Sequence, residues 1–306
     1  MAYRIDMAEP LADGLGRIAV EQLEAAIRNL RLPEDQRTVG VHRCRKSVKK
    51  TRALLRLVRA EIGEDLYRSE NATLRDIAAG LSAMRDADVM VETLTALREW
   101  AGERLQVSDI AALRRTLLEA QAALAGTPTD GGAAQHAIDG LESALERARL
   151  WPIERNRFIV VEGGIKRTYR SGRKGYARAL EDPTGDAMHE WRKQVKYLWY
   201  MTRILAGAVG DAGARLVEDL DRLAALLGDG RDLALLRAAA LATEGIFEDA
   251  RIVETIDIRR AELQEEAMSL GSRLYNPKPK SFTRMIRDGW NAWRNSLPPG
   301  LQESNG

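Results

Sequence analysis

Two stretches of the chain combine one histidine with a row of arginines and lysines at helical spacing. Residues 41–58 read VHRCRKSVKKTRALLRLV, and residues 188–205 read MHEWRKQVKYLWYMTRIL. At about 100° per residue, the cations of each stretch fall on one helix face and the apolar residues fall opposite. The two cationic faces consist of His42, Arg45, Lys46, Lys49, Arg52 and Arg56, and of His189, Arg192, Lys193, Lys196 and Arg203. Rows of guanidinium and ammonium groups are typical of sites that bind phosphate polymers.

A third basic stretch precedes the second of these faces. Residues 164–175 read GIKRTYRSGRKG, and Glu162 is the single acid between Arg155 and Arg178. A helix here would gather four cations on one side. They are Lys166, Arg170, Arg173 and Lys174. The sequence therefore predicts that this helix adds to the same anion-binding surface.

Like charges recur four residues apart within these stretches. Arg45 with Lys49 and Arg192 with Lys196 are such pairs, and each pair destabilises a helix by about 0.2–0.5 kcal/mol. A bound anion would relieve the repulsion. The alternative is neutralisation within the fold by nearby acids, namely Glu61, Glu64, Asp65, Asp86 and Asp88.

The two histidine-led stretches also form an internal repeat. When His42 is aligned with His189, Lys49 falls opposite Lys196, and Arg85-Asp86 has a counterpart in Arg231-Asp232. This repetition is typical of a duplicated unit. We therefore expect residues 1–306 to form a single domain made of a first repeat, 1–151, and a second repeat, 152–306.

The overall composition favours helices. Aromatic residues make up 5% of the chain, alternating strand patterns are missing, and strong helix formers are frequent. Breaks are expected at glycines and prolines, including Gly63, Gly80, Gly102, Gly210 and the stretch 228–230. The prediction is an all-α fold in which two pseudo-symmetric helical bundles flank a basic groove or channel.

Other features exclude several classes of protein. Cys44 is the single cysteine, which favours a reducing compartment. The chain has neither an apolar leader nor a run of apolar residues long enough to cross a bilayer. The formal net charge is only +2, so the distribution of charge is more informative than its total. These features predict a cytoplasmic protein without a membrane partner.

The candidate residues fit binding better than catalysis. The chain has no glycine-rich nucleotide loop, and His42 and His189 have no neighbouring ligands at metal-site spacing. We therefore predict no catalytic residue, no metal and no cofactor. A metal-dependent hydrolase acting on a phosphate polymer stays open as an alternative, with Asp86, Asp88 and Asp232 as its candidate ligands.

Nucleic acid is the second candidate partner, because the same faces could contact a sugar–phosphate backbone. Trp191, Tyr197, Trp199 and Tyr200 interleave with the second face and could stack on bases. The first face lacks such aromatics, which argues against nucleic acid. A purely structural role, with every cation neutralised internally, is the remaining alternative.

The duplicated H-x-x-R-K-x-V-K pattern, which begins at His42 and at His189, resembles the CHAD domain family. The glycine- and arginine-rich stretch 164–173 and the Arg-Asp pairs that end at Asp86 and Asp232 are similar to that family as well. The resemblance implies two helical bundles around a basic channel. It also implies non-catalytic binding of inorganic polyphosphate, with some members found on polyphosphate granules. One departure is that Arg52 is matched by Trp199, so we expect the second face to carry less charge.

Overall fold

The computed structural model describes residues 3–6, 9–81, 86–126, 131–248 and 250–297, and the regular structure within these ranges is helical, without a strand. The predicted all-α fold class is therefore confirmed. The helices are α1 (Leu11–Leu30), α2 (Arg37–Ile62), α3 (Glu64–Gly80), α4 (Asp86–Ala101), α5 (Val107–Gly126), α6 (Gly131–Ala148), α7 (Ile159–Glu181), α8 (Gly185–Leu241), α9 (Arg251–Tyr275) and α10 (Pro279–Asn295). Short 3-10 turns at Glu34–Gln36 and Gly102–Arg104 precede α2 and follow α4.

Most of the predicted breaks coincide with helix ends. Gly63, with φ of 87°, separates α2 from α3, and Gly80 is the last residue of α3. The break predicted at 228–230 is wrong, because α8 continues to Leu241. Gly228 instead makes room for a side chain: a Cβ atom there would lie 3.2 Å from a guanidinium nitrogen of Arg192.

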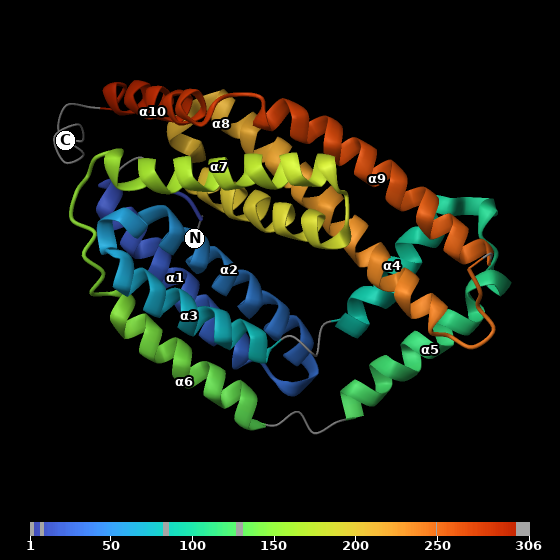
Figure 1. Cartoon of the computed structure of the whole chain (residues 1–306). Coiled ribbons are helices and arrows are strands. Elements are labelled where there is room, and N and C mark those ends of the chain that lie inside the picture. The colour runs from blue at the N-terminus through green and yellow to red at the C-terminus, as the bar shows by residue number, and fades with distance from the viewer. Residues whose placement is uncertain (1–2, 7–8, 82–85, 127–130, 249, 298–306) are drawn as a thin grey trace.

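The predicted break at Gly210 divides α8 into two parts. Its φ of 66° and ψ of −152° are non-helical, and glycine adopts a positive φ at little cost because it has no Cβ. The chain turns back here, so residues 211–241 run beside residues 185–209 (Figure 1). The contact between Arg192 and Gly228 lies between these two parts.

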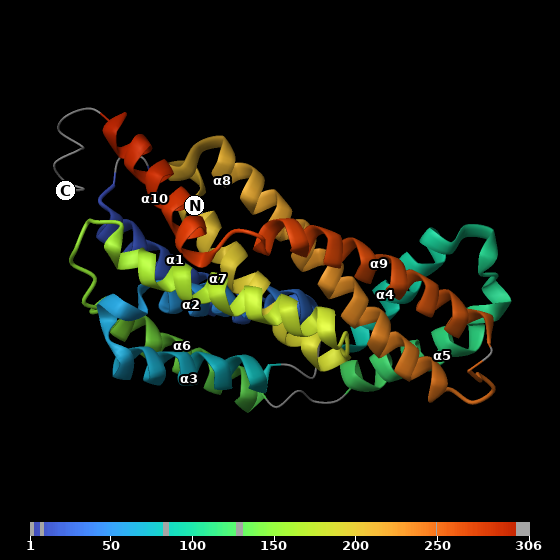
Figure 2. The ribbon, with the colours of Figure 1, turned by 45° about the horizontal axis from the view of Figure 1, so that its top comes forward.

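Packing mixes helices from the two predicted repeats. Helices α1, α2, α3 and α6 pack together, and α7, α8, α9 and α10 form a neighbouring layer (Figures 1 and 2). Helices α4 and α5 precede residue 151, yet they pack on α8 and α9. Equivalent helices do begin at similar intervals, such as α1 at Leu11 and α7 at Ile159. The pseudo-two-fold relation itself stays a prediction.

Helix α2 lies at the junction of these layers, in contact with α1, α3, α7 and α8. Its apolar side is fully buried, as Cys44, Val48 and Leu55 illustrate. Helix α7 crosses α2 very closely: a Cβ atom at Gly164 would lie 2.2 Å from the carbonyl oxygen of Leu57. Burial of the apolar side fixes the direction in which the cations of α2 point.

Candidate polyanion-binding site

The cationic faces of α2 and α8 meet at Arg56. Its Nη2 lies 3.4 Å from the hydroxyl oxygen of Tyr197 on α8, and its Cζ lies 4.2 Å from the centre of the Tyr197 ring. Arg56 also donates a hydrogen bond to the hydroxyl of Tyr67 on α3. This arginine therefore joins three helices through neutral partners.

Lysines from the two faces lie close enough to affect each other's proton affinity. Burial lowers the pKa of Lys196 on α8 to about 8, and the charges of Arg192 and Lys46 add to this effect, while Asp221 opposes it. Burial, followed by the charges of Arg203 and Lys46, lowers the pKa of Lys50 to about 8. We call Lys46, Lys50, Arg56, Lys196 and Arg203 the central cationic cluster.

Aromatic rings support this cluster. The ammonium nitrogen of Lys196 lies 4.0 Å from the centre of the Trp199 ring, and the guanidinium of Arg203 lies 4.9 Å from the same ring. The ammonium of Lys50 lies 4.9 Å from the ring of Tyr3, whose hydroxyl donates to the carbonyl of Lys50 at 3.0 Å. Rings attract cations through their quadrupoles and do not cancel the charge. They therefore orient these side chains and leave the charge available.

Two other arginines of the first face lean toward α3. Arg45 donates to the carbonyl of Ala78 at 2.8 Å, and Arg52 donates to the side-chain oxygen of Asn71 at 3.1 Å. Burial lowers the pKa of Arg52, and the charge of Arg56 contributes to the shift. His42 and Lys49 are half-buried on the same helix.

Two of the five acids proposed for internal neutralisation, Glu61 and Glu64, pair with arginines outside the predicted cationic faces. Glu61 pairs with Arg155, and Glu64 lies 2.6 Å from Arg59 and 2.8 Å from Arg68. The side chains of Asp86 and Asp88, like Arg85 as a whole, lie outside the described residues. In the part of the chain that the structure describes, no carboxylate lies within 4.0 Å of the cations of the central cationic cluster.

The cations of the second face, on α8, lie in different surroundings. Lys193 is exposed and pairs with Glu190 at 2.8 Å. His189 lines a narrow cavity of about 80 Å³ together with Arg231. Burial lowers the pKa of His189, and the charge of Arg231 adds to the shift. Its buried Nδ1 has no hydrogen-bond partner among the described residues.

The basic residues of α7 divide between two sides. Lys166, Arg170 and Arg173 line a pocket with the start of α10. In both ribbon views α10 and α3 lie on opposite sides of α7 (Figures 1 and 2). Lys174 is exposed and does not line this pocket. The structure thus places three of the four predicted α7 cations on the α10 side of the helix.

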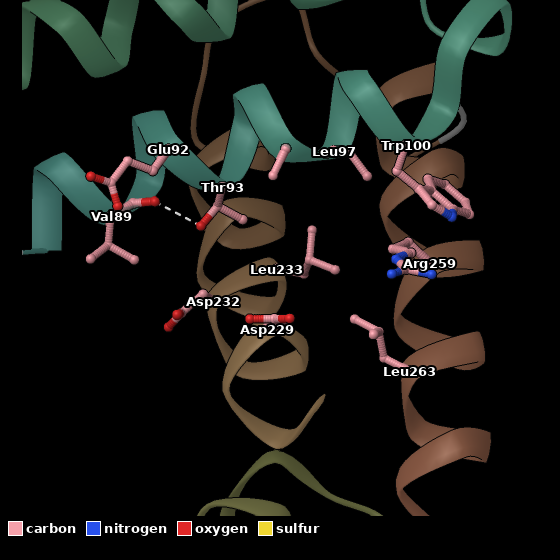
Figure 3. A pocket seen from close by; sticks show the side chains of 11 residues that line it. Val89, Glu92, Thr93, Leu97, Trp100, Asp229, Asp232, Leu233, Arg259 and Leu263 are labelled. Atoms are coloured by element: carbon pink, nitrogen blue, oxygen red, sulfur yellow. Dashed lines mark hydrogen bonds between the residues drawn. The ribbon is translucent and has the colours of Figure 1, made fainter. Parts of the chain in front are cut away.

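The aspartates of the metal-dependent alternative are only partly described. Asp232 lines a pocket between α4, α8 and α9 with Asp229 and Glu92 (Figure 3). Arg259 lines the same pocket, and the pKa of Asp229 is raised by burial and by the charge of Asp232. Within the described ranges, no three histidine, cysteine or acidic side chains are grouped so that they could hold a metal ion.

Some features of the site were missed by the sequence analysis. Lys50 lies on the flank of the predicted face, yet it joins the cluster because α8 crosses on that side. Tyr3 and Tyr67 lie outside both basic stretches and give no local signal.

Across the described helices, none is long and apolar enough to cross a membrane.

Comparison with known proteins agrees with this helical architecture. The CHAD domain model matches residues 17–241, and the chain belongs to the CHAD domain family. The crystal structure of the CHAD domain from the plant Ricinus communis is similar over 95% of both chains, with 19% identity and a TM-score of 0.56. PptA from Streptomyces chartreusis is similar over 92% of this chain and 100% of its own, with 15% identity and a TM-score of 0.52. No curated protein matches the sequence.

Proposed function

We propose that this protein binds inorganic polyphosphate at the central cationic cluster and does not catalyse its turnover. The observation that carries the proposal is the meeting of Arg56 on α2 with Tyr197 on α8. It brings the two cationic faces together with neutral side chains between them. Family membership supports the same ligand, because the sequence resemblance to CHAD domains implies polyphosphate binding.

The electrostatics of the cluster favour an anionic ligand. The mutual repulsion of Lys46, Lys50, Lys196 and Arg203 helps to lower the pKa of two of these lysines. An anion placed among these cations would raise the pKa of both lysines again, because it favours their charged forms. A polymer with a charge on every unit can contact several of these cations at once and release its counterions.

The aromatic rings favour polyphosphate over single-stranded nucleic acid. Proteins that bind single strands usually offer exposed rings on which bases stack. Trp199 and Tyr3 are 7% and 6% exposed, and their faces are already covered by cations. The cluster therefore offers charge without an open stacking surface, which suits a chain of phosphoryl groups.

The side chains around the cluster also favour binding over hydrolysis. Phosphoryl transfer assisted by metal ions needs carboxylates that hold the metal beside the reacting phosphate. The described side chains that contact the cluster are phenols and an indole. Asp221 influences the pKa of Lys196 from beyond 4.0 Å, and Glu190 is paired with Lys193. We expect the protein to hold the polymer in the cytoplasm, with association to polyphosphate granules as a consequence.

The test compares two double variants in binding to long-chain polyphosphate. Lys46→Gln with Lys196→Gln removes one cluster cation from each helix, whereas Arg114→Gln with Arg115→Gln removes two exposed cations on α5. The first should weaken binding about tenfold or more, and the second should have little effect. Wild-type affinity should fall roughly a hundredfold between 50 and 200 mM salt, because the cluster releases several counterions.

Competition separates the two candidate polymers. Single-stranded RNA and duplex DNA are added to the complex at the same phosphate concentration as the bound polyphosphate. We expect polyphosphate to stay bound. Displacement by either nucleic acid, or equal losses in the two double variants, would contradict the proposal.

A further inference from the structure

A second group of cations surrounds a pocket on the side of α7 that faces α10. The pocket has a volume of about 510 Å³ and lies between α7 and the first turns of α10. Six of its lining residues are basic: Lys166, Arg170, Arg173, Lys278, Lys280 and Arg284. In the described parts of the chain, none of the six has a carboxylate within 4.0 Å.

The corresponding surface of the other layer is built differently. The pocket between α1 and α6, which are the first and last helices of the first predicted repeat, is lined by acids as well as bases. Its arginines are paired: Arg31 with Glu142, and Arg28 with Glu24 at 3.5 Å. In the α1–α6 pocket the basic side chains are therefore neutralised by acids of the same two helices. The basic side chains of the α7–α10 pocket have no such acidic partners among the described residues.

One turn further along α10, an ion pair joins α10 to α7. Arg287 of α10 lies 2.9 Å from Glu162 of α7. By contrast, the first turn of α10 has no acid, and Lys280 stands there beside the positive end of the helix dipole. Cations at this end lower helix stability. The pocket thus concentrates repulsion that the neighbouring turn avoids.

The pocket is also rigidly framed. Arg173 donates to the carbonyl of Tyr275 at 3.1 Å, and Tyr169 of α7 stacks on Phe282 of α10 with ring centres 3.9 Å apart. The hydroxyl oxygen of Tyr169 lies 2.9 Å from the carbonyl oxygens of both Leu274 and Pro277, which share its single proton. These contacts fix α7 against the α9–α10 connection, so the cations converge before any ligand arrives.

We infer that the α7–α10 pocket is a second anion site, which takes a short run of phosphoryl groups such as an inorganic oligophosphate or one segment of a longer chain. The choice of an inorganic phosphate chain as its ligand rests on the proposed function. Six cations suit roughly six phosphoryl charges. One long polymer that occupies both sites would bind more tightly than at either site alone, because the second contact is intramolecular.

The experiment measures binding of tripolyphosphate to the full chain by titration calorimetry. The pocket variant is Arg170→Glu with Lys280→Glu, and the control of equal charge change is Arg114→Glu with Arg115→Glu; all four side chains are exposed. Both are made in the wild type and in the Lys46→Gln, Lys196→Gln background. In that background tripolyphosphate should still bind, and the pocket variant should weaken this binding about tenfold or more relative to the control.

The outcomes separate this inference from the proposed function. If the pocket variant matches the control for tripolyphosphate, the second site is refuted and the central cluster is unaffected. If the pocket variant abolishes long-chain binding while the cluster variant retains it, the second site stands and the proposed function loses its site. If the pocket variant loses only binding to mixed phosphatidylcholine–phosphatidylserine vesicles, the ligand is a lipid surface and the inference is wrong. Circular dichroism and thermal melts check that the variants fold.

Discussion

The ammonium group of Lys196 lies 4.0 Å from the centre of the Trp199 ring, less than one helical turn further along α8. Trp199 also contacts the guanidinium of Arg203, at 4.9 Å. In the aligned repeat, Trp199 takes the place of Arg52. The second face thus loses one cation and gains a ring that positions two others.

Replacement of this ring should therefore weaken polymer binding although no charge is removed. Each contact between a cation and a ring contributes about 0.5–1 kcal/mol. Trp199→Leu keeps the site apolar but frees Lys196 and Arg203, and we expect about a three- to tenfold loss of affinity for long-chain polyphosphate. Calorimetric titration measures the loss. Trp199→Phe is the control and should retain most of the affinity; if Phe and Leu behave alike, the ring does not position the cations.

The lysines with a lowered pKa should make binding sensitive to pH. Lys50 and Lys196 each have a pKa of about 8 in the protein without ligand. The bound anion favours the charged forms, so affinity should fall as pH rises from 7 to 9. Lys50→Arg with Lys196→Arg should flatten this dependence, because arginine stays charged. An unchanged pH profile in this variant would assign the dependence to other groups.

The lowered pKa values of Lys50 and Lys196 also predict that the protein without ligand becomes more stable as pH rises, whereas its affinity for the polymer falls. The folded pKa of both lysines lies below the ordinary value of 10.5. Between these values the unfolded chain holds more protons than the folded one, so the contribution of these lysines to the free energy of unfolding rises with pH. Urea titrations at pH 7.5 and 9.5 should show a smaller increase for Lys50→Met with Lys196→Met than for the wild type. Equal increases would contradict the prediction.

The histidines should contribute less than the lysines at mildly alkaline pH. Burial and the charge of Arg231 lower the pKa of His189, so its imidazole is neutral at pH 8. A neutral imidazole can offer one hydrogen bond but no charge. His42→Gln with His189→Gln should therefore cost less affinity at pH 8 than Lys46→Gln with Lys196→Gln. A larger loss in the histidine variant would indicate a chemical role for these residues.

The sequence predicted the helical class and the two cationic faces because both depend on local periodicity. It did not predict which neighbour each face would meet. Lys50 appears on a flank when α2 is considered alone, and becomes part of the cluster through the position of Arg203 on α8. Lys166 lies in a basic stretch but faces α10. These placements depend on helix crossings between segments far apart in sequence, which periodicity does not encode.

The error at Gly228 has the same origin. Glycine usually marks a helix end, so a break was predicted there. In the structure this residue is buried within α8, and its lack of a side chain lets Arg192 lie alongside. The reason for the glycine is a contact with another part of the helix, and only the fold reveals that contact.

The close crossing at Gly164 makes a final prediction about what holds the two cationic faces together. A Cβ atom at this position would lie 2.2 Å from the carbonyl oxygen of Leu57, and backbone atoms cannot move aside without separating α7 from α2. Overpacking of this kind costs about 1–3 kcal/mol or more, so Gly164→Ala should lower the melting temperature by several degrees. Gly16→Ala on α1, where no atom lies within 4 Å of the added Cβ, is the control and should stabilise by about 0.5–1 kcal/mol.

If α7 positions the cluster, Gly164→Ala should also weaken polyphosphate binding at temperatures where the variant is still folded. Unchanged affinity there would show that α2 and α8 hold the site without α7.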